Sequence, residues 1–304
     1  MTNLRTLKRL SAALLAASII TAPVAASAAT RFQQRPPSPQ KHMLFKVRGP
    51  NGATVYLLGS VHLLTPEAGK LPAEVDSAFE HAKVVAFETS IDSLQLRAQE
   101  MLTKARYPSG QTLKTSLSPA AVAKADSVVH LYGLSLDMVN GYRPWFVSMA
   151  LSQMVMQRAN YQPQFGVDVQ LSERAKTAHK QVIGLESVDF QLNLMDGIQP
   201  EDQERMITTA KGPADAAKDL MKIKDAWLTG DLKALEAAFN EADTESPRMM
   251  EMMLTRRNVS WMGKIDELLK GKDDALIVFG AGHLVGKMGV LELLRTKGYS
   301  IEQL

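Results

Sequence analysis

The sequence predicts an α/β fold in which a small mixed β-sheet carries two helical blocks packed on and beside it. Short apolar runs alternate with helical stretches along the chain, as they do in proteins of this class. The pair Asn51-Gly52 separates two apolar runs, residues 43–47 and 54–58, and predicts a β-hairpin. Two long segments, about 91–160 and 200–270, have helical sequence and predict the two blocks.

The first 28 residues have the pattern of an export signal. Arg5, Lys8 and Arg9 supply positive charge, residues 10–20 are apolar, and the Ala-Ser-Ala of residues 26–28 fits a cleavage site. The apolar run is short and rich in alanine, which disfavours a membrane span. We therefore expect cleavage after Ala28, a periplasmic or secreted protein, and no stable membrane anchor after that cleavage.

The remainder of the chain divides into a linker and one folded domain. Residues 29–42 are polar and rich in proline and predict a flexible linker, so the domain spans residues 43–304. Three of the 35 Lys and Arg residues lie in residues 1–28, and the other 32 balance the 32 acidic residues. This balance argues against a nucleic-acid partner. Because the chain has no cysteine, any metal must be bound through nitrogen and oxygen ligands.

Several apolar strands end next to a polar residue suited to catalysis or metal binding. We expect these strands at residues 54–58, 83–87, 181–185 and 275–279, with a terminal strand at 299–303. A helix at residues 73–82 would connect the first two of these strands as a parallel pair. Since parallel strands end at one edge of a sheet, the residues that follow them are expected to meet there.

Two of these strand ends carry the same motif, Gly-x-x-His. Gly59 leads to His62, and Gly280 leads to His283. Glycine permits a sharp turn and close backbone approach, and the histidine is then held by a rigid element, as metal ligands require. The alternative is that both histidines merely fill polar space at the edge of the sheet. The occurrence of the motif at two equivalent strand ends favours a functional site.

The other two strand ends carry carboxylates. Glu88 and Glu186 each follow a buried strand, where a charge is costly unless it is paired or bound to a metal. Helix capping, or a salt bridge with Arg143 or Arg257, is the alternative role for these glutamates. The other acidic candidate, Asp168, is expected near the start of a helix.

Three further residues are candidates to hold substrate or to stabilise an oxyanion: Arg143, Arg257 and Asn258. Arg256 and Arg257 are neighbours on a predicted helix and therefore point to different faces. We expect Arg257 to be the one that points inward.

Together these motifs make the chain resemble the TraB/GumN family. The resemblance rests on segments that span residues 43 to 304: Tyr56-Leu57-Leu58-Gly59-Ser60-Val61-His62, Phe87-Glu88-Thr89, Gly166-Val167-Asp168, Gly184-Leu185-Glu186, Arg257-Asn258, Gly280-Ala281-Gly282-His283-Leu284-Val285-Gly286 and Gly298-Tyr299. Ser60 stands where threonine is frequent in the family, a change that keeps the hydroxyl group. The family is similar to the Tiki proteases, which are metal-dependent enzymes that cleave Wnt ligands, and more distantly to the erythromycin-esterase and ChaN-like haem-binding groups. The resemblance implies a site built from both Gly-x-x-His motifs with glutamate and arginine partners, and manganese or cobalt as the metal. Zinc is a further candidate, apart from the resemblance.

The sequence therefore leads to a hypothesis of a metal-dependent hydrolase that acts on a peptide or another small amide substrate. His62, His283 and Glu88 would bind the metal, with Glu186 as a further ligand candidate, and the metal would activate a water molecule. A carboxylate that is not a ligand would act as general base, and Arg257 or Asn258 would stabilise the oxyanion. The alternative is a non-catalytic periplasmic protein that binds haem or a metal through the same histidines. The sequence leaves the oligomeric state open.

Overall fold

The computed structural model describes residues 40–304, and for residues 241–245 it describes the backbone alone. The predicted signal peptide (residues 1–28, with the cleavage site after Ala28) and residues 29–39 of the predicted linker lie outside the described residues.

A six-stranded mixed sheet forms the centre of the described part of the chain, which confirms the predicted α/β class. The strands lie in the order β4-β3-β5-β2-β1-β6. They are β1 (Leu44–Arg48), β2 (Thr54–Ser60), β3 (Val84–Phe87), β4 (Gln181–Gly184), β5 (Ala275–Gly280) and β6 (Ile301–Gln303). Strands β1 and β2 form the hairpin that Asn51-Gly52 predicts, and Gly52 has the positive φ of 97° that favours glycine.

The parallel part of the sheet is organised around β5. This strand pairs in parallel with β2 on one side and with β3 on the other, and β3 pairs in parallel with β4. The prediction that β2 and β3 form a direct pair is therefore wrong, although the two strands do run in the same direction. Residues 275–279 of β5 are fully buried, so the most apolar strand of the chain takes the central position.

Four helices pack against the sheet: α1 (Ala73–His81), α8 (Val167–Thr177), α14 (Arg256–Lys270) and α15 (Val290–Thr296). In α14 the buried residues Trp261, Ile265 and Leu269 recur every four positions and form one apolar face. This periodicity fixes which side of α14 faces the sheet, and it places Arg257, one turn earlier, on the same side.

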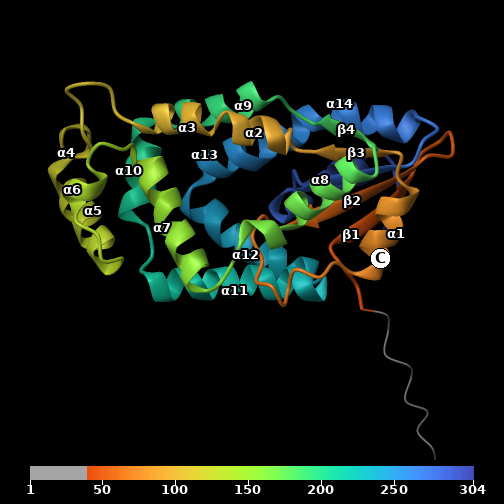
Figure 1. The fold of residues 1–304 in the computed structure, drawn as a ribbon, viewed down its shortest axis with the longest axis horizontal. Helices are drawn as coiled ribbons and strands as arrows, with labels where there is room; N and C mark the ends of the chain where they lie inside the picture. Colours follow the sequence, from red (N-terminus) through yellow and green to blue (C-terminus); the bar gives the residue numbers. More distant parts are fainter. Residues whose placement is uncertain (1–39) are drawn as a thin grey trace, which may run out of the picture. The chain divides into compact units, whose positions relative to one another are not determined.

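The other helices form a layer beside the sheet (Figure 1), which confirms the two predicted helical blocks. They are α2 (Ile91–Leu96), α3 (Ala98–Ala105), α4 (Leu113–Ser116), α5 (Pro119–Leu131), α6 (Leu136–Val139), α7 (Pro144–Arg158), α9 (Val188–Leu194), α10 (Pro200–Thr208), α11 (Pro213–Thr229), α12 (Leu232–Glu245) and α13 (Pro247–Met250). Four short turns complete the structure: η1 (Pro163–Phe165), η2 (Met195–Gly197), η3 (Glu251–Thr255, a π-helix) and η4 (Ala281–Leu284).

The two helical blocks pack on each other and share a second core. Helix α7 contacts α10 and α11, and α5 contacts α10. Their shared core includes Val128, Leu151 and Ile207 and is separate from the core around the sheet. Within residues 40–304, none of the helices combines the length and apolar character needed to cross a membrane.

Candidate functional site

The four parallel strands deliver the predicted site residues to one edge of the sheet. Ser60 of β2 pairs with Gly280 of β5, and Phe87 of β3 pairs with Gly184 of β4. His62, Glu88, Glu186 and His283 follow these strand ends within a few residues. The shared direction of the strands is what brings together residues that are as far apart in sequence as His62 and His283.

Three of these side chains surround the backbone of Gly280. Its N–H group donates a hydrogen bond of 2.7 Å to Glu88 Oε1. A Cβ atom at this position would lie 3.3 Å from Glu88 Oε1, 3.6 Å from His62 Nε2 and 3.7 Å from His283 Cδ2. A side chain at this position would therefore press on the Glu88 carboxylate and contact both imidazoles, at the point where the three groups approach each other.

Each imidazole is oriented through its Nδ1 atom by a residue from a helix. His62 Nδ1 donates to Asp168 Oδ2 at 2.9 Å, and the other oxygen of Asp168 accepts from Ser60 Oγ at 2.9 Å. His283 Nδ1 donates to Asn258 Oδ1 at 2.5 Å. The amide of Asn258 is itself fixed, since its Nδ2 donates to the Met288 carbonyl at 2.8 Å. Both histidines are thus held by Nδ1, and their Nε2 atoms lie on the side of Gly280 and Glu88.

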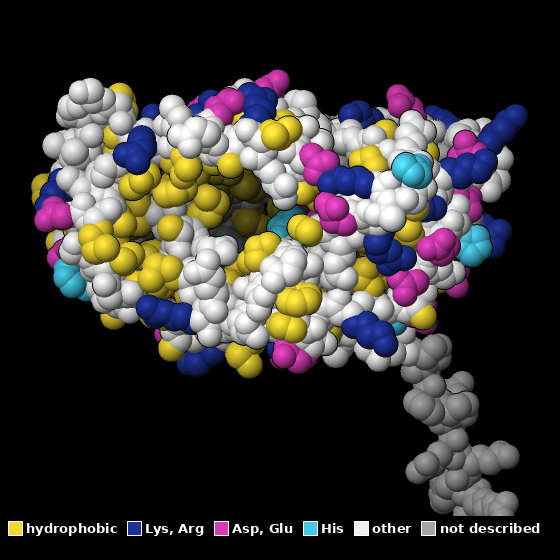
Figure 2. Space-filling view, viewed as in Figure 1, with side chains coloured by type: hydrophobic (Ala, Val, Ile, Leu, Met, Phe, Trp, Pro, Cys, Tyr) yellow, Lys and Arg dark blue, Asp and Glu magenta, His cyan; other side chains and the backbone are white. Residues whose placement is uncertain are grey.

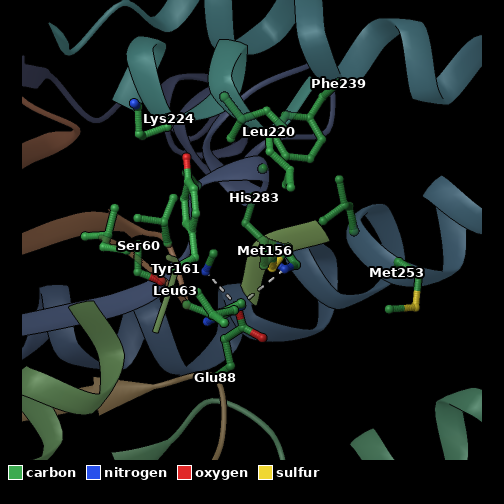
Figure 3. Close-up of a pocket in the computed structure, with 18 of the residues that line it drawn as sticks. Ser60, Leu63, Glu88, Met156, Tyr161, Leu220, Lys224, Phe239, Met253 and His283 are labelled. Carbon is green, nitrogen blue, oxygen red and sulfur yellow. Dashed lines mark hydrogen bonds and ion pairs between the residues drawn. The ribbon is translucent and has the colours of Figure 1, made fainter. Parts of the chain in front are cut away.

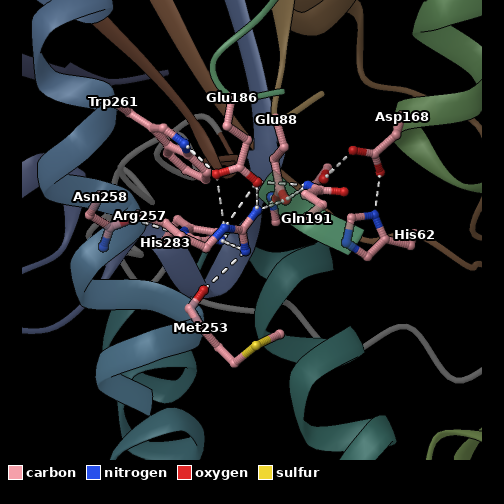
Figure 4. Close-up of polar contacts among 12 residues, drawn as sticks. His62, Glu88, Asp168, Glu186, Gln191, Met253, Arg257, Asn258, Trp261 and His283 are labelled. Carbon is pink, nitrogen blue, oxygen red and sulfur yellow. Dashed lines mark hydrogen bonds and ion pairs between the residues drawn. The ribbon is translucent and has the colours of Figure 1, made fainter. Parts of the chain in front are cut away.

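Arg257 lies between both glutamates and His283 (Figure 4). Its Nη2 donates to Glu88 Oε2 and, at 2.7 Å, to Glu186 Oε1, while its Nη1 donates to His283 Nε2 at 3.2 Å. The side chain is 6% exposed, so this is a buried ion cluster in which one guanidinium pairs with two carboxylates.

A π-helical turn, η3, ends two residues before Arg257. In this turn the Met253 carbonyl accepts a hydrogen bond of 3.0 Å from Arg257 Nη1. Single π turns often occur at functional sites. The sequence predicts a continuous helix here, and the structure shows that the turn helps to direct the guanidinium inward.

Glu186 accepts hydrogen bonds from three residues, of which two were not expected from the sequence. Besides Arg257, it accepts from Trp261 Nε1 at 2.9 Å and from Gln191 Nε2 at 2.8 Å. The Trp261 ring also packs on His283, with ring centroids 4.4 Å apart. The spacing offers one signal for Trp261, because it lies four residues after Arg257 on the same helix. Glu186 is therefore positioned to hold Arg257.

Arg143 is placed apart from these residues. It lies at the start of α7, and its guanidinium stands over the Tyr107 ring at 5.8 Å. Among the described residues, no hydrogen bond or ion pair connects its side chain to His62, Glu88 or His283. Asp168, which is at the start of α8 as expected, belongs to the site through His62.

The polar cluster does not form a closed metal cage. Within residues 40–304, no group of three or more His, Cys, Asp or Glu side chains is arranged so that it could hold a metal ion. The contact between Arg257 Nη1 and His283 Nε2 is one reason, because the guanidinium occupies the lone pair that a metal would need.

Comparison with known proteins places the chain in a family. The sequence pattern of the TraB/PrgY/gumN family matches residues 43–303, a range that includes every residue of the cluster. The chain belongs to the TraB/PrgY/gumN family. It is similar to the uncharacterized protein YbaP of Escherichia coli K12 and to that of Shigella flexneri, each 21% identical over 246 residues, which is 81% of this chain and 89% of the relative. No solved structure matches the chain significantly.

The surroundings give the two histidines of this TraB/PrgY/gumN site opposite charge states. The Asp168 carboxylate, which also accepts the hydrogen bond of His62 Nδ1, raises the pKa of His62 to about 9. Burial lowers the pKa of His283 to about 3, and the Arg257 cation acts in the same direction against the attraction of Glu88. At neutral pH and without a metal, His62 is therefore an imidazolium and His283 a neutral imidazole.

The carboxylate and the guanidinium of the site remain charged. Burial raises the pKa of Glu88, but His283, Arg257 and His62 outweigh it and hold the pKa at about 2. Burial lowers the pKa of Arg257, whereas its contacts with Glu186 and Glu88 more than compensate and raise it. Four groups with different charge and proton-transfer properties therefore lie near Gly280. They are the Glu88 carboxylate, the His62 imidazolium, the neutral His283 imidazole and the Arg257 guanidinium.

Proposed function

We propose that this chain is a hydrolase of amide bonds that works with a divalent cation held by His62, His283 and Glu88. The observation that carries the proposal is the approach of His62 Nε2, the His283 ring and Glu88 Oε1 to the backbone of Gly280, with His283 Nε2 3.7 Å from Glu88 Oε1. Metal-binding histidines typically donate their second ring nitrogen to a carboxylate or carbonyl oxygen, as these two donate to Asp168 and Asn258.

The residues present fit such a cation in their chemistry. Two imidazole nitrogens and one carboxylate oxygen suit manganese, cobalt or zinc. Arg257 would give up its contact with His283 Nε2 and keep its pairs with Glu88 and Glu186. A bound divalent cation would lower the pKa of a water molecule and so supply a nucleophile at neutral pH.

The protein residues would then perform the remaining tasks. Asp168 and Asn258 hold the imidazoles in place, and Glu186 holds Arg257 through Nε and Nη2. Arg257 lines the adjacent cavity and stabilises the negative charge that develops on the carbonyl oxygen of the substrate. Glu88 is a weak general base because its pKa is about 2, so we assign it to the metal instead. Export of the protein, directed by residues 1–28, is part of the proposal.

Metal analysis of the purified protein tests the proposal. After exposure to Mn²⁺ and removal of free metal, we expect close to one equivalent in the wild type and a loss of most of it in His62→Ala and in His283→Ala. His130→Ala is the matched control, since His130 is an exposed histidine on α5. Equal metal content in all four proteins would overturn the proposal. A haem absorption band that depends on His62, without hydrolysis of any peptide, would favour a non-catalytic binding protein instead.

A further inference from the structure

A cavity of about 370 Å³ opens beside the candidate site. His62, Glu88, Arg257 and His283 line one end of it. Apolar side chains from α7, α11, α12 and η3 form much of the rest, including Met156, Leu220, Ile223, Phe239 and Met253. Figure 3 shows several of these side chains around the space next to His283 and Glu88, and Figure 2 shows a deep hollow lined by hydrophobic side chains.

A second cavity, of about 310 Å³, also adjoins the candidate site. Its lining includes Phe87, Ile91, Leu94 and Val169, together with Asp168 and Gln191. His62 and Glu88 line both cavities. The candidate catalytic point therefore borders two cavities with different linings.

We propose that the substrate is a peptide that lies across His62 and Glu88, with residues on both sides of the cleaved bond and two apolar side chains in the larger cavity. This inference rests on the proposed function and specifies its substrate. Water adds across an internal amide bond: its oxygen bonds to the carbonyl carbon, the C–N bond breaks, and the amine leaves with a proton.

The size and the chemistry of the larger cavity support two apolar side chains. An apolar cavity of roughly 150 Å³ holds one benzene molecule, so 370 Å³ provides space for two side chains of the size of leucine or phenylalanine. Met156 and Met253 are flexible and can adapt to apolar groups of different shape. Lys224 also lines the cavity, and its ammonium lies 3.5 Å from Asp225, so it is paired within the protein.

The test measures binding separately from cleavage. Two peptides, blocked by acetyl and amide groups, carry a fluorophore and differ only in the presence of Leu-Phe or Ser-Gln at their centre. Fluorescence anisotropy with metal-free protein gives their affinities, and mass spectrometry with Mn²⁺ gives the cleavage position. We expect the Leu-Phe peptide to bind at least tenfold more tightly, since one apolar group in a pocket contributes roughly 10- to 200-fold, and to be cut at an internal bond.

Variants of residues in and next to the lining of the larger cavity test whether this cavity causes the preference for the Leu-Phe peptide. Leu220→Glu places a charge in the cavity and is expected to reduce the preference at least tenfold. Met221→Glu, at the next residue, which is 52% exposed and outside the cavity lining, should change it less than twofold. Met156→Gln, nearly the same size as the native residue, replaces Leu220→Glu if that variant does not fold.

The outcomes separate this inference from the proposed function. Tight binding of the Leu-Phe peptide without any cleavage upholds the apolar preference and contradicts the hydrolase. Cleavage of both peptides at equal rates, with equal affinities, overturns the preference and leaves the hydrolase in place. The inference is also overturned if the protein removes only terminal residues from the peptides, or if Leu220→Glu prefers the Leu-Phe peptide as strongly as the wild type does.

Discussion

The two Gly-x-x-His turns have the same sequence pattern but place their imidazoles in opposite surroundings. The His62 side chain is 61% exposed and is paired with a carboxylate, whereas the His283 side chain is 4% exposed and is paired with a neutral amide. The pKa of His62 is accordingly raised to about 9 and that of His283 lowered to about 3. The motif therefore sets the position of the histidine, while its surroundings determine its charge: the Asp168 carboxylate for His62 and burial for His283.

The largest expected effect concerns Arg257, which contacts the His283 turn. Arg257→Leu leaves Glu88 and Glu186 without their buried cation, and we expect a loss of about 3–5 kcal/mol in the free energy of unfolding. Urea denaturation followed by circular dichroism measures it. Arg256→Leu is the matched control, because Arg256 pairs with Glu251 on the surface and such a pair contributes about 0–1 kcal/mol. Equal losses in the two variants would contradict the role assigned to the buried cluster.

Exchanging the partners of the two histidines tests the comparison directly. In metal-free protein, Asp168→Asn should lower the pKa of His62 from about 9 toward its ordinary value, and Asn258→Asp should raise that of His283 from about 3. Titration of the histidine NMR signals measures both values. If neither pKa moves in its variant, the partner residues do not set the charge states.

The same exchange predicts a pH dependence of stability. The folded pKa of His62 is raised, so the stability that Asp168 contributes is fully present below about pH 6.5 and is lost as the pH rises through about 9. Because the His62 side chain is mostly exposed, we expect only about 1 kcal/mol. Urea denaturation of wild type and Asp168→Asn at pH 6 and pH 10 should show this difference shrinking at high pH. A difference that grows with pH would contradict the assignment.

The two motif glycines should respond differently to substitution. A Cβ at Gly59 would lie 2.4 Å from Leu284 Cδ1, inside the packed core, so Gly59→Ala is expected to destabilise the fold by about 1–3 kcal/mol. Gly280→Ala instead crowds Glu88 and His62 and should weaken Mn²⁺ binding about tenfold, an effect typical of changes around metal ligands. Thermal denaturation and calorimetric Mn²⁺ titration distinguish the two. Unchanged Mn²⁺ affinity in Gly280→Ala would separate Gly280 from the metal site.

The smallest expected effect is a control for glycine substitution itself. Gly263 is exposed on α14, with no atom within 4 Å of an added Cβ. Gly263→Ala should therefore stabilise the protein by about 0.5–1 kcal/mol, because alanine restricts the unfolded chain and favours a helix. Destabilisation in thermal denaturation would show that the helix does not tolerate a side chain there.

The parts of the site that the sequence predicts are those encoded by local pattern. An apolar strand ending in glycine and histidine, or in glutamate, can be read from ten residues, and these strand ends do meet at one edge of the sheet. The inward position of Arg257 also follows from local sequence, since it lies four residues before Trp261 on an amphipathic helix.

The rest depends on contacts between distant segments. Asp168 reaches His62 across 106 residues, and Gln191 joins the cluster because helix α9 follows β4. Strand β5 likewise lies between β2 and β3 although it is the last of the parallel strands along the sequence. Such pairings are decided by the packing of the whole chain, and a local pattern does not contain them.

In the proposed site, one divalent cation contacts His62 and His283 at the same time. Titration of protein labelled at histidine with Mn²⁺, followed by NMR, tests it directly, because the paramagnetic ion broadens signals near its binding site. We expect the ring signals of His62 and His283 to broaden together and to reach completion at one equivalent of Mn²⁺, while those of His130 and His81 stay sharp. Broadening of only one of the two site histidines, or of all histidines equally, would contradict it.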